Sequence, residues 1–210
     1  MKHLKILGLA AVAAMALMAF LGAGTASATV LCKTQMGFTS CYVAGWEYPV
    51  TTSVEITQTP ATTMVLETTG GVVLDTCVGS TLSGSMTFAG AAIATPQIAL
   101  AKLEWGACSR TTHTLKLGKL EVHHISETDN GTLTATGGIE VTINTIFGSC
   151  VFGTGEALDV GKLTGGNPAT INTQKAVIPK ISGNAACPAH AVWNAQFTVT
   201  SPAPIYVHQD

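Results

Sequence analysis

Apolar and polar residues alternate along much of this chain, and that period of two limits its fold more than any other feature of the sequence. Residues 193–200, WNAQFTVT, alternate strictly, as do residues 54–57, VEIT. Successive side chains of a β-strand point to opposite faces of a sheet, so the pattern predicts strands with one buried face. No stretch keeps a helical period, because Gly90 and Pro96 interrupt the Ala-rich segment 89–102. The sequence therefore predicts an all-β fold.

The middle of the chain predicts a hairpin. The apolar residues switch parity around Gly118, which predicts a β-bulge there. The segment 129–131, DNG, follows as a turn that accepts positive φ, and one strand, or two strands broken at Gly137 and Gly138, returns from it. Such short connections favour antiparallel pairing. The tail 201–210, SPAPIYVHQD, is expected to form a final edge strand, because its prolines cannot donate into a central ladder.

The first 28 residues have the pattern of a signal peptide. Lys2 and Lys5 supply the positive start, residues 6–21 the apolar stretch, and residues 26–28, ASA, the small-residue cleavage site. A membrane span needs about 20 apolar residues, so no membrane association is expected after cleavage. Residues 29–210 are then expected to be released to the extracellular space as a single all-β domain.

Two segments with similar patterns leave a second domain organisation open. GGVVLDTCVGSTLSG at 70–84 and GGIEVTINTIFGSCVFGTG at 137–155 both run from two glycines through an apolar strand to a cysteine. This echo is consistent with two related halves, 29–112 and 113–210. The alternative is that any two strands between glycine turns look alike, because β segments are weakly specified.

The cysteines all follow the leader and are even in number, which predicts three disulfides in an oxidising compartment. Of the 15 possible pairings, we expect the sequential one. Zinc is the rival interpretation, but the chain has no Cys-x-x-Cys pair, so no metal or other cofactor is expected. The fold class is then an antiparallel β-sandwich or Greek-key barrel stapled by disulfides. The cysteines are Cys32, Cys41, Cys77, Cys108, Cys150 and Cys187.

The charge balance excludes one class of partner. The chain has 10 Lys and Arg, of which two lie in the leader, against 12 Asp and Glu. A protein that binds nucleic acid or an anionic membrane surface shows an excess of basic residues. No nucleic-acid partner is therefore expected.

The residues that could act in catalysis form no recognisable motif. His123 and His124 are adjacent on a predicted strand, so their side chains point to opposite faces. No Gly-x-Ser-x-Gly segment is present. We therefore expect no enzymatic activity, with a secreted hydrolase whose site assembles only in three dimensions as the alternative. The acids that such a site could use are spread singly, at Asp75, Glu104, Glu121, Glu140 and Asp159.

Three aromatic residues lie together in CYVAGWEYP, just after the second cysteine. Tyr42, Trp46 and Tyr48 would form a platform for a glycan or a protein surface if they were exposed on a stapled loop. The alternative is that they anchor the first strand in the core. We expect a secreted, non-catalytic structural or binding module. A subunit that assembles edge to edge into a homo-oligomer is a further alternative, because the strands are long and carry little charge.

Several short segments together carry a resemblance. They are LCK after the cleavage site, GSCVFGTG, ACP followed by WNAQFTV, and the tail PIYV. With them the chain resembles a group of uncharacterised secreted proteins of actinobacteria that are paired in cysteines and rich in Thr and Gly. The resemblance implies an extracellular, disulfide-bonded β protein and no particular activity.

Overall fold

The computed structural model describes residues 28–35, 41, 45–90, 94–146 and 148–209, so the predicted signal peptide lies outside the described residues. No helix in the described part is long and apolar enough to cross a membrane. The strands are β1 (Thr29–Cys32), β2 (Ser53–Gln58), β3 (Met64–Thr68), β4 (Val73–Val78), β5 (Thr81–Phe88), β6 (Gln97–Glu104), β7 (Ala107–Cys108), β8 (Thr112–Lys116), β9 (Lys119–His124), β10 (Gly131–Thr136), β11 (Glu140–Thr145), β12 (Gly148–Gly153), β13 (Ala157–Thr164), β14 (Thr170–Gly183), β15 (His190–Ser201) and β16 (Tyr206–Gln209).

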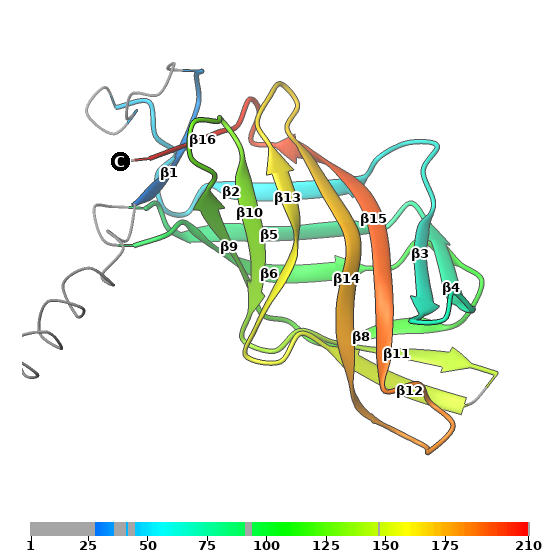
Figure 1. The fold of residues 1–210 in the computed structure, drawn as a ribbon. Helices are drawn as coiled ribbons and strands as arrows, with labels where there is room; N and C mark the ends of the chain where they lie inside the picture. The colour runs from blue at the N-terminus through cyan, green and yellow to red at the C-terminus, as the bar shows by residue number, and fades with distance from the viewer. Residues whose placement is uncertain (1–27, 36–40, 42–44, 91–93, 147, 210) are drawn as a thin grey trace, which may run out of the picture.

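Eight antiparallel strands close into a barrel. Their order is β2-β5-β6-β9-β10-β13-β14-β15, and β15 pairs again with β2. In Figure 1, β2, β5 and β6 run across the direction of β13, β14 and β15. Side chains alternate as predicted, and in β10 Leu133 and Ala135 are buried while Thr132 and Thr134 are half-buried. The expected all-β antiparallel fold is confirmed in its barrel form.

A second group of strands, which we call the outer sheet, extends from the barrel. It consists of β7, β4, β3, the first half of β15, the second half of β14, β12, β11 and β8 (Figure 1). β14 and β15 are 14 and 12 residues long, enough to run through both parts. The register shifts between Thr173 and Ala176, where Lys175 has a φ of 55° and its backbone N–H donates to Asn194 Oδ1. The two long strands therefore join the barrel and the outer sheet at this bulge.

Glycines lie at two places where the chain passes between the outer sheet and the barrel. Gly118 lies between β8 of the outer sheet and β9 of the barrel, so the β-bulge predicted at this position is instead a crossing. A Cβ at Gly118 would collide with the Thr136 carbonyl oxygen. Gly137 and Gly138, with φ of 75° and 71°, separate β10 of the barrel from β11 of the outer sheet. Of the two predicted forms for this segment, the structure has the two strands.

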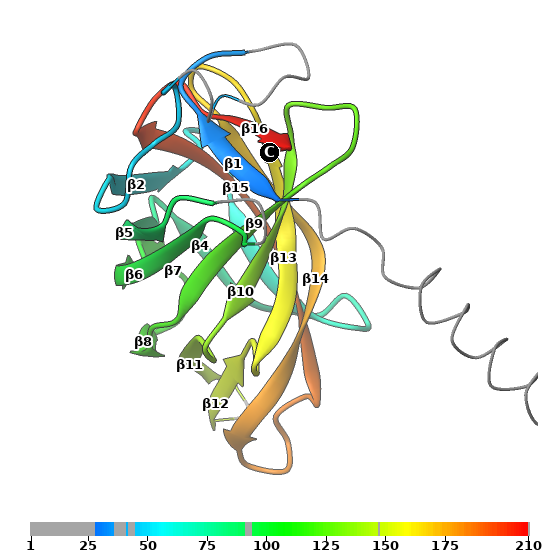
Figure 2. The ribbon, with the colours of Figure 1, turned by 90° about the vertical axis from the view of Figure 1, so that its left-hand side faces the viewer.

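A short two-stranded sheet lies at one end of the barrel. β1 pairs with β16; Leu31 and Val207 of these strands pack into the main apolar core, whereas Val30 packs with Cys32 and Cys41. The pair lies in front of the barrel in Figure 2, where this end faces the viewer. Among the described residues β16 pairs with β1 alone, as expected for an edge strand, and Val207 N–H also donates to the Asp129 carbonyl.

Three disulfides join the cysteines in the expected sequential order, Cys32–Cys41, Cys77–Cys108 and Cys150–Cys187. They indicate an oxidising setting. None of the cysteines lies on a barrel strand. Both chain segments considered as halves, 29–112 and 113–210, contribute strands to the barrel and to the outer sheet.

Candidate binding cavity

The interior holds a cavity of about 100 Å³ between the barrel and the outer sheet. An eight-stranded barrel is just wide enough for side chains to fill it or for one small ligand. Several positions on the wall carry small residues, among them Ala135, Gly153 and Thr173, so the interior is not filled. The barrel contributes apolar side chains such as Ile56, Leu120 and Phe197, and the outer sheet contributes others such as Leu66, Ile143 and Phe152.

One carboxylate, that of Asp75, reaches the wall of this apolar cavity. Asp75 is on β4 and is 3% exposed. Its Oδ1 accepts hydrogen bonds from Thr76 N at 2.8 Å, Ser109 Oγ at 2.8 Å and Arg110 N at 2.9 Å, and its Oδ2 accepts one from Thr112 Oγ1 at 2.5 Å. A buried carboxylate needs such donors to offset the loss of water. Since Thr112 is on the edge strand β8, Asp75 joins β8 to β4, the neighbour of the other edge strand, β7.

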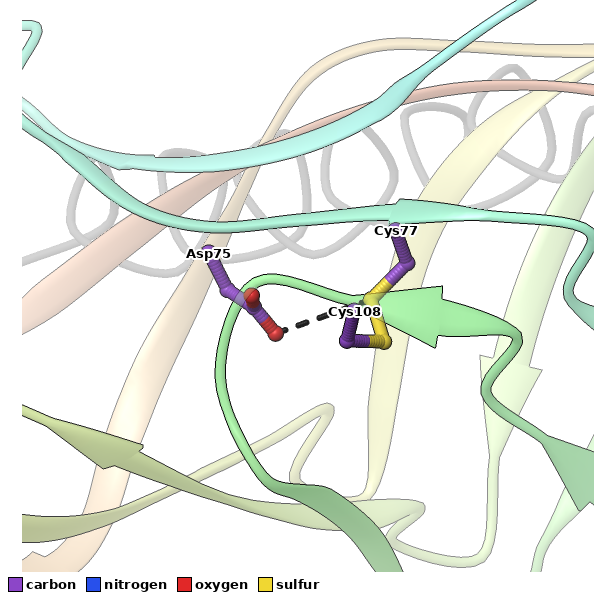
Figure 3. Close-up of side chains that lie close together, drawn as sticks. All are labelled: Asp75, Cys77 and Cys108. Atoms are coloured by element: carbon purple, nitrogen blue, oxygen red, sulfur yellow. Dashed lines mark hydrogen bonds between the residues drawn. A yellow bond between two sulfur atoms is a disulfide. The ribbon is translucent and has the colours of Figure 1, made fainter.

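The cluster in Figure 3 contains residue types that bind metals, and its chemistry excludes a thiolate site. Cys77 Sγ and Cys108 Sγ are bonded to each other, whereas metal binding by cysteine needs a free thiolate. Cys77 Sγ lies 3.6 Å from Asp75 Oδ2 (dashed line in Figure 3) and carries no hydrogen to donate. The cluster is a structural tie at the edge of the outer sheet.

The two tryptophans that line the cavity differ in the hydrogen bonding of their indole N–H groups. Trp105 Nε1 donates to Thr114 Oγ1 at 2.9 Å, and Thr114 Oγ1 donates in turn to the Leu103 carbonyl at 2.9 Å. Trp193 Nε1 is buried and has no hydrogen-bond partner among the described residues. Trp193 packs against the apolar clusters of both the barrel and the outer sheet. Among the described residues that line the cavity, Trp193 carries the one side-chain nitrogen or oxygen that is fully buried without a hydrogen-bond partner.

The predicted aromatic platform is divided between the core and the surface. Tyr48 is 7% exposed, and its hydroxyl donates to the Pro204 carbonyl at 2.5 Å. Trp46 is 47% exposed. Tyr42 lies outside the described residues. Burial thus removes the Tyr48 ring from any surface platform and leaves Trp46 exposed.

The acids considered for a hydrolase lie on several strands. Glu104 is exposed and pairs with Lys102 Nζ at 2.8 Å. Glu121 on β9 and Asp159 on β13 lie on the outer face of the barrel with Thr134 of β10 between them. Asp159 Oδ1 accepts a hydrogen bond from Thr134 Oγ1 at 2.6 Å. Glu121 and Asp159 are therefore neighbours across one strand on an outer surface, and Glu140 lies on β11 of the outer sheet.

The structure also shows a buried histidine that the sequence did not single out. His208 on β16 is 1% exposed, and its Nε2 lies 3.5 Å from Asp129 Oδ1. Burial lowers the pKa of His208, and nearby His124 adds to the lowering, while the Asp129 carboxylate opposes it. His124 Nε2 is 2.7 Å from the Thr128 carbonyl, so it lies under the same end of the barrel.

No protein-family model, curated protein or solved structure matches the chain. The resemblance to actinobacterial secreted proteins therefore stays a prediction.

Proposed function

We propose that the protein is a secreted, non-catalytic binding module that holds a small apolar molecule in its interior cavity. The observation that carries the proposal is the apolar cavity itself. Empty apolar space destabilises a fold by about 24 cal/mol per Å³, or about 2 kcal/mol for a cavity of this size. Apolar cavities of about 150 Å³ stay dry and take up benzene or xenon.

Two further features support release from the cell. The first 28 residues have a signal-peptide pattern, and three disulfides join the described cysteines. A carrier or sensor outside the cell gains from a stapled fold, because its binding site has to persist without chaperones.

The test is titration of the protein with xenon and with benzene, followed by methyl NMR spectra. We expect saturable shifts confined to methyl groups on the cavity wall, such as those of Leu120, Leu133 and Ile143. Ala135→Leu places a larger side chain into the cavity and is expected to abolish the shifts. Ala157→Leu makes the same change at an exposed barrel position and is expected to leave binding unchanged.

A second variant keeps the test decisive if Ala135→Leu does not fold. Leu133→Ala enlarges the cavity, so it is expected to bind larger aromatic compounds, such as toluene, more tightly than the native protein does. If neither xenon nor benzene shifts the wall methyl groups of the native protein, the proposal is wrong.

Recognition at the surface through Trp46 is a second candidate function. Its support is the 47% exposure of this indole beside the segment stapled by Cys32–Cys41. Fluorescence quenching of a protein with Trp46 as its only tryptophan, with and without cell-wall or plant polysaccharides, tests it. Protection of Trp46 by one polysaccharide supports glycan binding, and equal quenching in every case contradicts it.

A further inference from the structure

The cavity wall reaches solvent on one side of the molecule. Leu82 of β5 and Leu103 of β6 lie opposite each other and line the cavity, yet both are half-buried. Inward-facing leucines elsewhere on the barrel, such as Leu120 and Leu133, are only 3% and 4% exposed. Water therefore contacts the apolar wall at Leu82 and Leu103.

Two more half-buried residues of the wall, Trp105 and Val141, lie beside these leucines. Thr114 of β8 accepts the Trp105 indole N–H, donates to the Leu103 carbonyl and pairs with Val141 of β11. We call Leu82, Leu103, Trp105 and Val141 the mouth of the cavity. The mouth lies where the barrel meets β8 and β11, on the far side of the barrel from β1 and β16 (Figures 1 and 2). The other half-buried wall residues are Thr112, Ile178 and Trp193.

The cavity is longer than it is wide. β14 lines it at Ile171, Thr173 and Ile178, a stretch of about 20 Å at the rise of a β-strand. A round cavity of about 100 Å³ would be only about 6 Å across, so it could not touch both ends of that stretch. The space is therefore narrow, and a chain of methylene groups fits it better than a ring does.

One carboxylate and two hydroxyls of the wall already have partners within the protein. The Asp75 carboxylate accepts four hydrogen bonds, one of them from Thr112 Oγ1. Thr154 Oγ1 accepts the Ile139 N–H at 3.1 Å. No lysine or arginine of the described residues lines the cavity. A charged or strongly polar group of a ligand would lose its water inside the cavity without a matching partner, so its place is at the mouth.

We infer that the molecule held in the cavity is a single-chain amphiphile, with its unbranched alkyl end inside and its polar end group in water at the mouth. The inference rests on the proposed function and specifies the ligand class. The narrow apolar space takes the alkyl chain, and the side of the molecule that carries Leu82 and Leu103 takes the end group.

A nitroxide joined through an amide to a hexanoyl chain tests the orientation of the ligand. The unpaired electron broadens the NMR signals of protons near it. We expect the methyl signals of Leu82 and Leu103 to be broadened most, and those of the buried Leu133 and Ile171 to be broadened less. Hexanol, which carries no nitroxide, is expected to give saturable shifts of the wall methyl groups without broadening them.

A charge placed at the mouth is the second test. Leu82→Asp puts a carboxylate there, and Ser83→Asp, the matched control, puts one at the next residue of β5, on the opposite face of the strand. We expect Leu82→Asp to raise the affinity of hexylamine relative to that of hexanoate by about fivefold or more. The same ratio for Ser83→Asp should stay within twofold of the native ratio.

The shape of the cavity is tested with alcohols. From propanol to hexanol, each added methylene is expected to raise the affinity by about fourfold. Cyclohexanol has as many carbon atoms as hexanol but is wider. After correction for the partition of each alcohol between water and octane, cyclohexanol is expected to bind more weakly than hexanol.

The outcomes separate the two proposals. If xenon, benzene and hexanol all fail to bind the native protein, the proposed function is wrong and the inference fails with it. If xenon binds but hexanol does not, or if cyclohexanol binds more tightly than hexanol after the correction, the cavity function stands and the inference is overturned. Strongest broadening at Leu133 and Ile171 overturns it equally, because the end group would then lie inside. The nitroxide experiment uses the native protein and decides the matter if Leu82→Asp does not fold.

Discussion

The barrel and the outer sheet differ in how their strands are held at the edges. Every barrel strand has a hydrogen-bonded neighbour on both sides, and no cysteine lies on any of them. In the described part of the chain, the outer sheet ends at β7 and β8, each paired with a strand on one side only. Cys77–Cys108 and Cys150–Cys187 both lie in the outer sheet or its loops, and Thr112 of β8 donates to Asp75 of β4, the neighbour of β7. Where backbone pairing does not close a sheet, covalent and buried polar ties take its place.

The largest effect is expected from removing the polar tie. Asp75→Ala leaves the N–H of Arg110 and the hydroxyls of Ser109 and Thr112 without their acceptor, which should lower the free energy of unfolding by about 3 to 5 kcal/mol. Urea denaturation of the native protein and of Asp75→Ala measures this loss. Asp159→Ala on the barrel is the control, since its exposed bond to Thr134 should be worth less than about 1 kcal/mol. Equal losses in the two variants would contradict the distinction between the two parts.

The next effect concerns the longest disulfide loop. Replacing Cys150 and Cys187 together by alanine opens a loop with a sequence separation of 37 and should cost about 3 to 4 kcal/mol. Hydrogen exchange should show faster opening of amides in β11 and β12, with those of β9 and β10 still protected. The matched variant, with Cys32 and Cys41 replaced, should leave β11 and β12 unchanged. If amides across the barrel lose protection as much as those of β11 and β12, the disulfide does not stabilise the outer sheet in particular.

The smallest effect is expected from lowering the pH, which should reduce the free energy of unfolding through His208. Burial lowers the pKa of His208 below the value of about 6.5 that the unfolded chain has. As the pH falls below about 6.5, the unfolded chain binds a proton that the folded protein does not, so stability is full above that pH and is lost as the pH falls toward the lower folded value. One group contributes at most about 1.4 kcal/mol per pH unit.

The measurement is urea denaturation between pH 7.5 and pH 5 of the native protein, His208→Gln and His190→Gln. His208→Gln should have a flatter pH profile than the native protein. The exposed His190 serves as the control, and its variant should follow the native profile. A His208→Gln profile parallel to the native one would mean that the buried histidine does not couple folding to pH.

The strands and the disulfides are predictable from the sequence because both depend on local information. The alternation at residues 193–200 requires one buried face, and an even set of cysteines past a leader favours pairing. The parity switch at Gly118 predicts a bulge, whereas the structure has a crossing there. A period of two says which face is buried and nothing about which sheet a strand joins, so a crossing and a bulge have the same pattern.

The cavity could not be predicted for a different reason. Its wall combines side chains from both parts, and its volume depends on the sum of their sizes. Ala135 and Thr173 are ordinary residues of alternating strands, and only the pairing brings them to one space. The unpaired state of Trp193 Nε1 likewise depends on which groups the fold places around it. The sequence leaves the exposure of Trp46 open, since tryptophan is common both in cores and in binding surfaces.

Because β14 and β15 belong to both the barrel and the outer sheet, the protein cannot be cleaved into two intact parts. The chain passes from one part to the other at Gly118 and again at Gly137 and Gly138, and the two long strands belong to both. No single site of cleavage separates a fragment that contains one complete part. Most contacts join residues distant in sequence, a feature of slow-folding β proteins. Proteolytic dissection and modular recombination, which work for chains with consecutive domains, should therefore yield only unfolded pieces.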